Sequence, residues 1–172
     1  TGRVDQAVAL LKECLGLAKD AASPEAIQTK NALAKIALAR QDLAEAKKYS
    51  DEVIKESPKN ADALFTRGTV YLLRGEAASA IPDFRTVVSE NPQFILAHIR
   101  LAEAHALNGE TNLAMDTLKA AQRIDPKSRD LNRALARQYA SERNVKEAEG
   151  ILRKILQDNP NDLEVMVELG DL

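Results

Sequence analysis

The sequence predicts an all-α protein, an α-solenoid of stacked antiparallel helix pairs, and two observations carry this prediction. Prolines recur at equal intervals along the chain, at Pro58, Pro92, Pro126 and Pro160. Aromatic residues make up only 3% of the 172 residues, while Ala, Val, Ile and Leu are plentiful. A core of small and aliphatic side chains suits closely packed helices better than a β-sandwich.

A second marker keeps the same period as the prolines. Ala46, Ala80, Ala114 and Ala148 recur at the same interval, and each precedes its proline by the same distance along the chain. Two independent markers that agree over four periods exclude a chance match. Self-similarity at a fixed period of roughly 20–50 residues indicates a repeat architecture, and the period here, about 34 residues, lies within that range.

Each period is expected to form two helices. In the clearest one, residues 61–74 form the first helix, Gly75 turns the chain, and residues 77–90 form the second. A glycine after a helix adopts the left-handed conformation that ends it. The residue before Pro92 disfavours the α conformation, which stops the second helix.

The period divides the chain into a single array of units. Residues 1–20 match only a second helix, residues 163–172 match only the start of a first helix, and the whole units are 21–60, 61–94, 95–128 and 129–162. The unit 21–60 has about five extra residues, and Ser23 can cap a helix that begins at Pro24. We therefore expect its first helix to be about one turn longer than the others, and the chain to be an internal piece of a longer array.

The units resemble the tetratricopeptide repeat family. The unit that begins at Ala61 departs from the family pattern only at position 7, where Arg67 replaces the usual Leu. The resemblance implies a right-handed superhelix and a non-enzymatic scaffold for protein–protein interaction. The residues that carry it at positions 4, 8, 11, 15, 20, 24, 27 and 32 are Leu64, Gly68, Tyr71, Gly75, Ala80, Phe84, Val87 and Pro92.

The resemblance also implies a groove for a peptide or a partner helix, lined by the concave face of the first helices. Exposed Phe65 and Ile99 would anchor an apolar segment, unless they pack across the helix pair. Arg100, Arg133 and Arg137 would orient the segment through charged hydrogen bonds. The full set of groove candidates is Asn31, Lys35, Phe65, Thr69, Leu72, Leu96, Ile99, Arg100, Glu103, Arg133 and Arg137.

The two histidines and the cysteine are expected to pack rather than to react. His98 and His105 occupy positions 4 and 11, which are packing positions in the family. They lie about 10.5 Å apart along a helix, which is too far to share one zinc ion. Cys14 occupies position 27, where we expect a buried thiol. We therefore predict no catalytic, metal or cofactor site, and no enzymatic activity.

Charge and hydropathy limit the classes of partner. Lys and Arg (24) nearly balance Asp and Glu (26), which argues against a wide nucleic-acid footprint. No apolar run approaches the roughly 20 residues that span a bilayer. The expected partner is a protein or a peptide, and the alternative is an assembly module that self-associates through its ends or its convex faces. A soluble protein is expected, either cytoplasmic or from the bacterial envelope. The envelope alternative rests on the alanine-rich style of the repeats, which is similar to that of bacterial tetratricopeptide-repeat lipoproteins linked to exopolysaccharide export.

Overall fold

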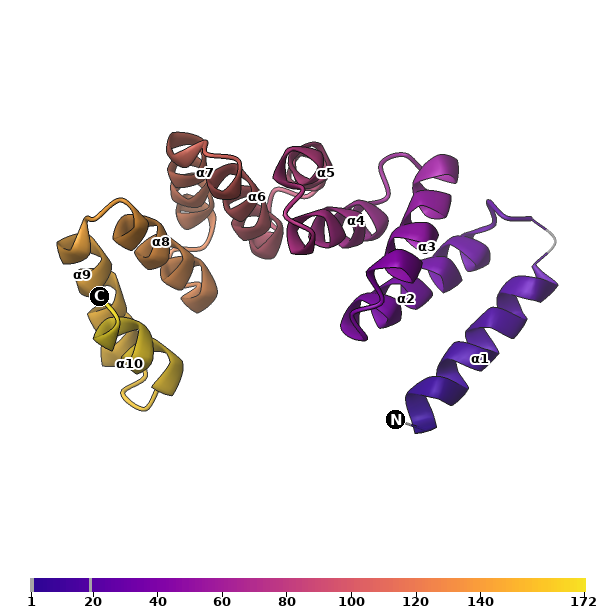
Figure 1. Ribbon diagram of the computed structural model, residues 1–172, viewed down its shortest axis with the longest axis horizontal. Helices are drawn as coiled ribbons and strands as arrows, with labels where there is room; N and C mark the ends of the chain where they lie inside the picture. The colour runs from indigo at the N-terminus through magenta and orange to yellow at the C-terminus, as the bar shows by residue number, and fades with distance from the viewer. Residues whose placement is uncertain (1, 19) are drawn as a thin grey trace. The chain divides into compact units, whose positions relative to one another are not determined.

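The computed structural model describes residues 2–18 and 20–172, and these residues form ten α-helices and no β-strand (Figure 1). Consecutive helices pack in pairs, α2 with α3, α4 with α5, α6 with α7 and α8 with α9. The chain is thus an all-α solenoid of helical hairpins, as predicted. The helices are α1 (Gly2–Leu17), α2 (Pro24–Ala39), α3 (Leu43–Glu56), α4 (Ala61–Leu73), α5 (Ala77–Glu90), α6 (Ile95–Leu107), α7 (Thr111–Ile124), α8 (Arg129–Ser141), α9 (Val145–Asp158) and α10 (Leu163–Gly170).

The helices divide between two compact units. The first unit is Thr1–Pro92, with α1 to α5, and the second is Gln93–Leu172, with α6 to α10. Each unit has its own buried clusters of apolar side chains. The continuity of one array through both units stays a prediction.

The turns inside the helix pairs share one backbone conformation. Gln41, Gly75, Gly109 and Arg143 lie one period apart, and all four have a left-handed φ between 60° and 79°. The residue after each donates its N–H back into the preceding helix, as Glu76 does to the carbonyl of Tyr71 at 2.8 Å. This is the glycine-type helix ending that satisfies otherwise unpaired carbonyl groups. Two of the four turns adopt it without a glycine.

The helix α2 is longer than the other first helices, as its sequence predicts. It has 16 residues, against 13 in each of α4, α6 and α8. The Ser23 hydroxyl accepts the N–H of Ala26 at 3.2 Å, and Pro24 is the first helical residue. Both the cap and the extra turn are confirmed.

Small residues allow the two helices of a pair to approach closely. Ala46, Ala80, Ala114 and Ala148 are all 0% exposed. A Cβ atom on Gly68 would lie only 2.9–3.1 Å from three ring atoms of Phe84, which is itself fully buried. The α4–α5 pair therefore depends on the missing side chain of Gly68.

Arg67, the departure from the family pattern, forms a network of ion pairs at the same seam. Its guanidinium binds both carboxylate oxygens of buried Asp83, at 2.8 and 2.7 Å, and Asp51 of α3 at 3.0 Å. These hydrogen bonds, Asp83 first, raise the pKa of Arg67 against the opposing effect of burial. A charged cluster replaces the apolar contact that leucine would make.

The histidines pack as predicted, whereas the cysteine does not. His98 and His105 are only 5% and 4% exposed, and His105 Nδ1 lies 2.6 Å from Glu110 Oε2. Cys14 is exposed, so its predicted burial is wrong. Among the described residues α1 packs mainly on α2, through Val8, Leu11 and Leu15, and Cys14 is not part of that contact.

The contact between Gly68 and Phe84 generates a test with a matched control. Gly68→Ala should overpack the α4–α5 seam and lower the free energy of unfolding by about 1–3 kcal/mol. Gly150→Ala, in α9, meets no atom within 4 Å and should raise it by about 0.5–1 kcal/mol. Urea unfolding followed by circular dichroism measures both, and equal effects of the two substitutions would refute the packing argument.

The left-handed turns generate a second test, in which glycine should stabilise. Gln41→Gly and Arg143→Gly relieve strain at φ 60° and should each raise the free energy of unfolding by about 0.5–1 kcal/mol. Gly109→Ala introduces the same strain and should lower it by about 1 kcal/mol. Thermal unfolding gives the signs, and a destabilising Arg143→Gly would contradict the argument.

Candidate functional site

A hollow in the second unit lies along the first helices α6 and α8. Its volume is about 250 Å³, and we call it the α6–α8 hollow. Its apolar walls and floor come from α6, α7 and α8, and its polar rim from α6 and α8. The apolar residues are Ile99, Ala102, Ala106, Leu118 and Ala134, and the polar ones are Glu103, Arg137, Gln138 and Ser141.

Three of the predicted groove residues line this hollow, but not in the expected way. Ile99 is only 6% exposed and packs in the core with Leu118 and Leu135. The prediction of an exposed Ile99 anchor is therefore wrong, and the alternative that it packs between helices holds. Glu103 and Arg137 line the hollow through partly exposed side chains.

The start of α6 carries two further candidates that do not line the hollow. Leu96 is 41% exposed. Arg100 forms an ion pair with Glu103 at 2.7 Å, one turn along the same helix. Among the described residues its Nε atom is buried without a hydrogen-bond partner. The Arg100 guanidinium is thus directed along its own helix toward Glu103.

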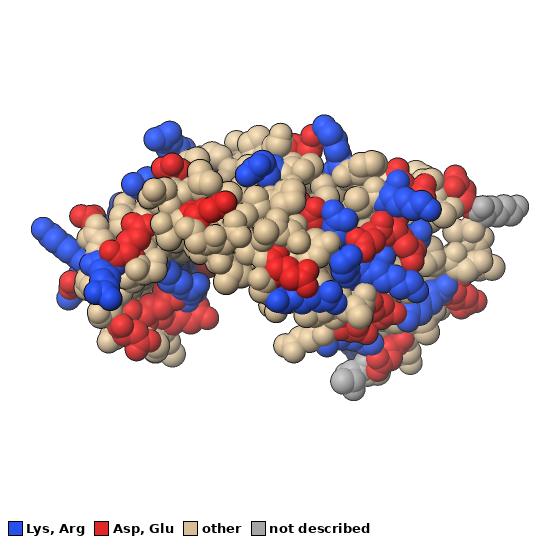
Figure 2. All heavy atoms as spheres, turned by 45° about the horizontal axis from the view of Figure 1, so that its top comes forward, with Lys and Arg blue, Asp and Glu red and all other residues tan. Residues whose placement is uncertain are grey.

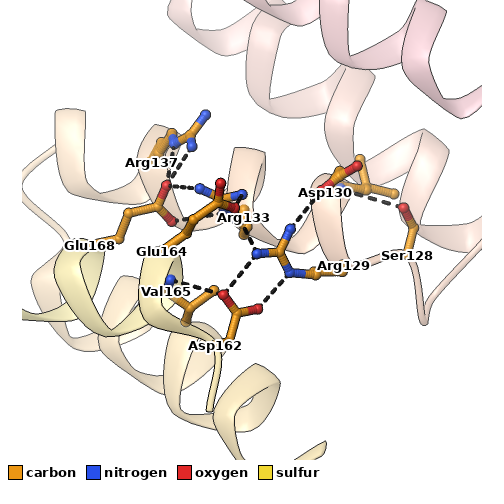
Figure 3. Close-up of polar contacts among 10 residues, drawn as sticks. Ser128, Arg129, Asp130, Arg133, Arg137, Asp162, Glu164, Val165 and Glu168 are labelled. Atoms are coloured by element: carbon orange, nitrogen blue, oxygen red, sulfur yellow. Dashed lines mark hydrogen bonds and ion pairs between the residues drawn. The ribbon is translucent and has the colours of Figure 1, made fainter. Parts of the chain in front are cut away.

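The predicted ligand-orienting arginines of α8 already bind carboxylates of α10 (Figure 3). Arg133 contacts Glu164 and Glu168, each at 2.7 Å, and Arg137 also binds Glu168. Arg129 binds both carboxylate oxygens of Asp162, at 2.5 and 2.8 Å. We call this cluster the α8–α10 ion-pair seam. On the face shown in Figure 2, acidic and basic side chains likewise lie interspersed.

The seam stays ionised well below neutral pH. Hydrogen bonds from Arg129 lower the pKa of Asp162 to about 2, although burial opposes the shift. Partial burial also opposes ionisation of Glu168, but Arg133 and Arg137 bring its pKa below the usual range. Asp162 additionally caps α10 by accepting the Val165 N–H at 3.2 Å. One carboxylate thus both starts the helix and joins it to α8.

The candidates of the first unit are also engaged in local contacts. Phe65 packs edge to face on Phe84, with ring centroids 5.7 Å apart, but it is only half-buried, so its role as an anchor stays a prediction. The Thr69 hydroxyl donates to the Phe65 carbonyl, and Leu72 is half-buried. Asn31 Nδ2 donates to Asn60 Oδ1 at 3.1 Å, and Lys35 pairs with Asp62 at 2.9 Å.

Sequence reasoning missed the small and uncharged residues of the α6–α8 hollow. Ala106, Ala134, Gln138 and Ser141 line it but were not among the candidates. Three of them, Ala106, Ala134 and Ser141, occupy positions 12, 6 and 13 of their repeats, which the family resemblance already assigns to the concave face. Small side chains form the recess, whereas size and charge in the sequence indicate only the residues around it.

The described residues contain neither a metal-binding cluster nor a helix that could span a membrane. Among the described residues, no group of three or more His, Cys, Asp or Glu side chains is placed to hold a metal ion. None of the described helices combines the length and apolar character needed to cross a bilayer.

The low pKa of Asp162 generates a pH prediction. A carboxylate whose pKa is depressed in the folded state stabilises the fold above its unfolded pKa, and loses this effect as pH falls. The difference in urea midpoint between wild type and Asp162→Asn, which keeps the capping oxygen, should therefore shrink from about pH 5 to about pH 2. Asp116→Asn, on the exposed side of α7, is the control. A constant difference for Asp162→Asn would contradict the seam's role.

The chain is similar to known proteins both in sequence, over part of its repeats, and in fold. It is 39% identical over 77 residues to the tetratricopeptide repeat and J domain-containing co-chaperone DNJ1 of Fusarium oxysporum f. sp. lycopersici, covering 45% of the chain and 15% of that protein. A tetratricopeptide repeat protein from Parabacteroides merdae superposes with a TM-score of 0.85 at 22% identity, covering 99% of this chain and 66% of that one. YrrB, described as a tetratricopeptide repeat protein with an unusual peptide-binding site, gives 0.76 at 20% identity, covering 99% and 85%.

The family assignment follows from three matching segments. Family models described as tetratricopeptide repeat match residues 31–95, 71–138 and 129–172. The helix pairs of the structure occupy these same segments. The chain spans only a small part of the curated relative that it matches, so the comparison bears on the repeats alone. The chain belongs to the tetratricopeptide repeat family, whose repeats form protein–protein interaction modules.

Proposed function

We propose that this chain binds a peptide segment or a partner helix in the α6–α8 hollow, which would take one apolar side chain of the partner. The observation that carries the proposal is the hollow itself, an alanine-lined recess on the face of the first helices. The eleven predicted groove residues lie in both units, and the proposal limits the binding site to the α6–α8 hollow of the second unit.

The size of the hollow favours a side chain over a whole small molecule. Sites for drug-sized ligands usually measure about 300–1,000 Å³, and this hollow measures about 250 Å³. A helix or an extended peptide anchors through single apolar side chains at regular intervals. The alanines of the hollow supply the depth for one such anchor.

The rim supplies polar groups of both signs around this recess. Glu103 and Arg137 have partly exposed side chains, with their charged groups bound to Arg100 and Glu168. A peptide backbone needs donors and acceptors at the edge of an apolar pocket. Gln138 Nε2 already donates to Glu142 and the Ser141 hydroxyl to the Gln138 carbonyl, which leaves the side-chain oxygens of both residues as acceptors. This arrangement suits a peptide better than a purely apolar ligand.

The comparisons support the class of function and leave the partner open. The description of YrrB attributes a peptide-binding site to a protein of the same fold, but at 20% identity the likeness extends to the fold alone. The relatives named above give no support to an envelope lipoprotein of exopolysaccharide export. Self-association stays a prediction, and exposed Met166 and Val167 on α10 are the apolar side chains in its favour.

Filling the α6–α8 hollow should weaken the proposed binding strongly. A random peptide library displayed on phage would first supply peptides that bind the wild-type protein. Ala106→Leu combined with Ala134→Leu occupies the recess from both helices and should weaken their binding about tenfold or more, as expected for a lost central anchor. Fluorescence anisotropy with a labelled selected peptide measures the change.

Ala78→Leu is the matched control, because Ala78 is an exposed residue in the first turn of α5. It should bind the peptide as wild type does, and thermal unfolding should show that all variants are folded. If the selected peptides bind the filled variant as tightly as the wild type, the α6–α8 hollow is not the site.

A further inference from the structure

A larger hollow lies in the second unit between the second helices α7 and α9. Its volume is about 940 Å³, and we call it the α7–α9 hollow. Ile151, Ile155 and Pro126 give it apolar surface. Its volume falls within the range of pockets that hold ligands of substantial size.

Basic side chains surround this apolar surface. Lys119 and Arg123 come from α7, Lys127 from the turn before α8, and Lys154 from α9. Asp158 is the only carboxylate among the described residues that line the hollow. The hollow is therefore strongly positive, although the chain as a whole has a net charge of −2.

These four cations, like Arg143 and Lys146, differ from the ion-paired arginines of the second unit. Within the part of the chain that the structure describes, no charged side-chain nitrogen of these four residues lies within 4.0 Å of a carboxylate oxygen. Arg129 also lines the hollow, but its guanidinium is held by Asp162. The α8–α10 ion-pair seam neutralises one side of α8, while the four cations of the α7–α9 hollow form no ion pair within the described residues, and Asp158 is the one carboxylate beside them.

One wall of the hollow is fixed by side-chain hydrogen bonds. Gln122 Nε2 donates to Asn132 Oδ1, and Asn132 Nδ2 donates to the Pro126 carbonyl, both at 3.1 Å. These bonds tie α7, the turn and α8 to one another beside Lys127 and Arg123. Preorganised walls reduce the entropy that a ligand must overcome on binding.

We propose that the α7–α9 hollow binds an acidic polypeptide segment, whose carboxylates contact Lys119, Arg123, Lys127 and Lys154 and whose aliphatic side chains cover Ile151 and Ile155. This site uses the second helices and is separate from the α6–α8 hollow of the proposed function. The same four cations would attract any polyanion, so the chemistry of the floor decides the class of ligand.

The floor favours a peptide over nucleic acid. Single-stranded nucleic acids bind through aromatic side chains on which their bases stack, and the residues that line the hollow include no aromatic side chain. Its isoleucines instead match aliphatic side chains. The nearby Tyr139 ring is already covered by the Lys119 ammonium, which lies 5.8 Å from its centroid.

Binding of a defined probe tests this proposal. The probe is a fluorescently labelled peptide in which glutamates and leucines are separated by serines, and its counterpart has glutamines in place of the glutamates. Fluorescence anisotropy with the whole chain should show binding of the glutamate peptide that weakens with added salt, because the contacts are ionic and exposed. The glutamine peptide should bind at least about tenfold more weakly.

Charge reversal locates the site. Arg123→Glu combined with Lys154→Glu should weaken binding of the glutamate peptide about tenfold or more. Lys55→Glu combined with Arg85→Glu changes the net charge equally at exposed positions of the first unit, and it should leave binding within about twofold. The variant that fills the α6–α8 hollow should bind the glutamate peptide as wild type does, which separates this proposal from the proposed function.

Three outcomes would overturn the proposal. One is equal binding of the glutamate and glutamine peptides to the wild-type chain, which needs no variant. Another is equal loss of binding in the two charge-reversed variants, once circular dichroism has shown both to be folded. The third is binding of a thymidine oligonucleotide without binding of the glutamate peptide, which would make the hollow a nucleic-acid surface.

Discussion

The close approach of two helices at small side chains is the constraint on which this structure depends. In the α4–α5 pair the ring of Phe84 fills the space that any side chain on Gly68 would need. The alanine in the second helix of each pair is fully buried at the equivalent seam. Since these contacts set the position of each second helix on its first helix, they also set the recesses that open between successive pairs.

The period alone was enough to predict the fold, because it reports a packing rule that each pair obeys locally. The turn glycines and the buried histidines follow from the position of a residue within one repeat, and the Ser23 cap follows from the serine and proline that precede α2. Cys14 fails for the same reason, because its burial requires a neighbouring helix on a side where the described residues supply none. The position of a residue within a repeat predicts the helix face on which it lies. Whether the residue is buried depends on which neighbouring helix covers that face.

The candidate site was harder to predict because its side chains interact with residues of the neighbouring repeat. Lys59 with Glu90, Arg129 with Asp162 and Arg133 with Glu164 are separated by 31 to 33 residues, which is nearly one period. A charged residue in such an array must therefore be compared with the residues about one period away before it is assigned to a ligand. By that comparison Arg133 belongs to the structure, and the four basic residues of the α7–α9 hollow remain available.

The Arg67 network has a consequence for how such a protein can evolve. Arrays of this kind lengthen when a repeat is copied in tandem, and a copy of residues 61–94 would take residues 61–94 themselves as its preceding unit. Arg85 occupies the place in this repeat that Asp51 holds in the one before it, so the copied arginine would meet a positive charge instead of a carboxylate. Its fork with Asp83 would be inherited, but its contact with the previous unit would become repulsive. Residues 61–94 therefore keep all the contacts of Arg67 only when they follow the repeat that contains Asp51, so a duplication that copies both repeats together would disturb the array less than one that copies residues 61–94 alone.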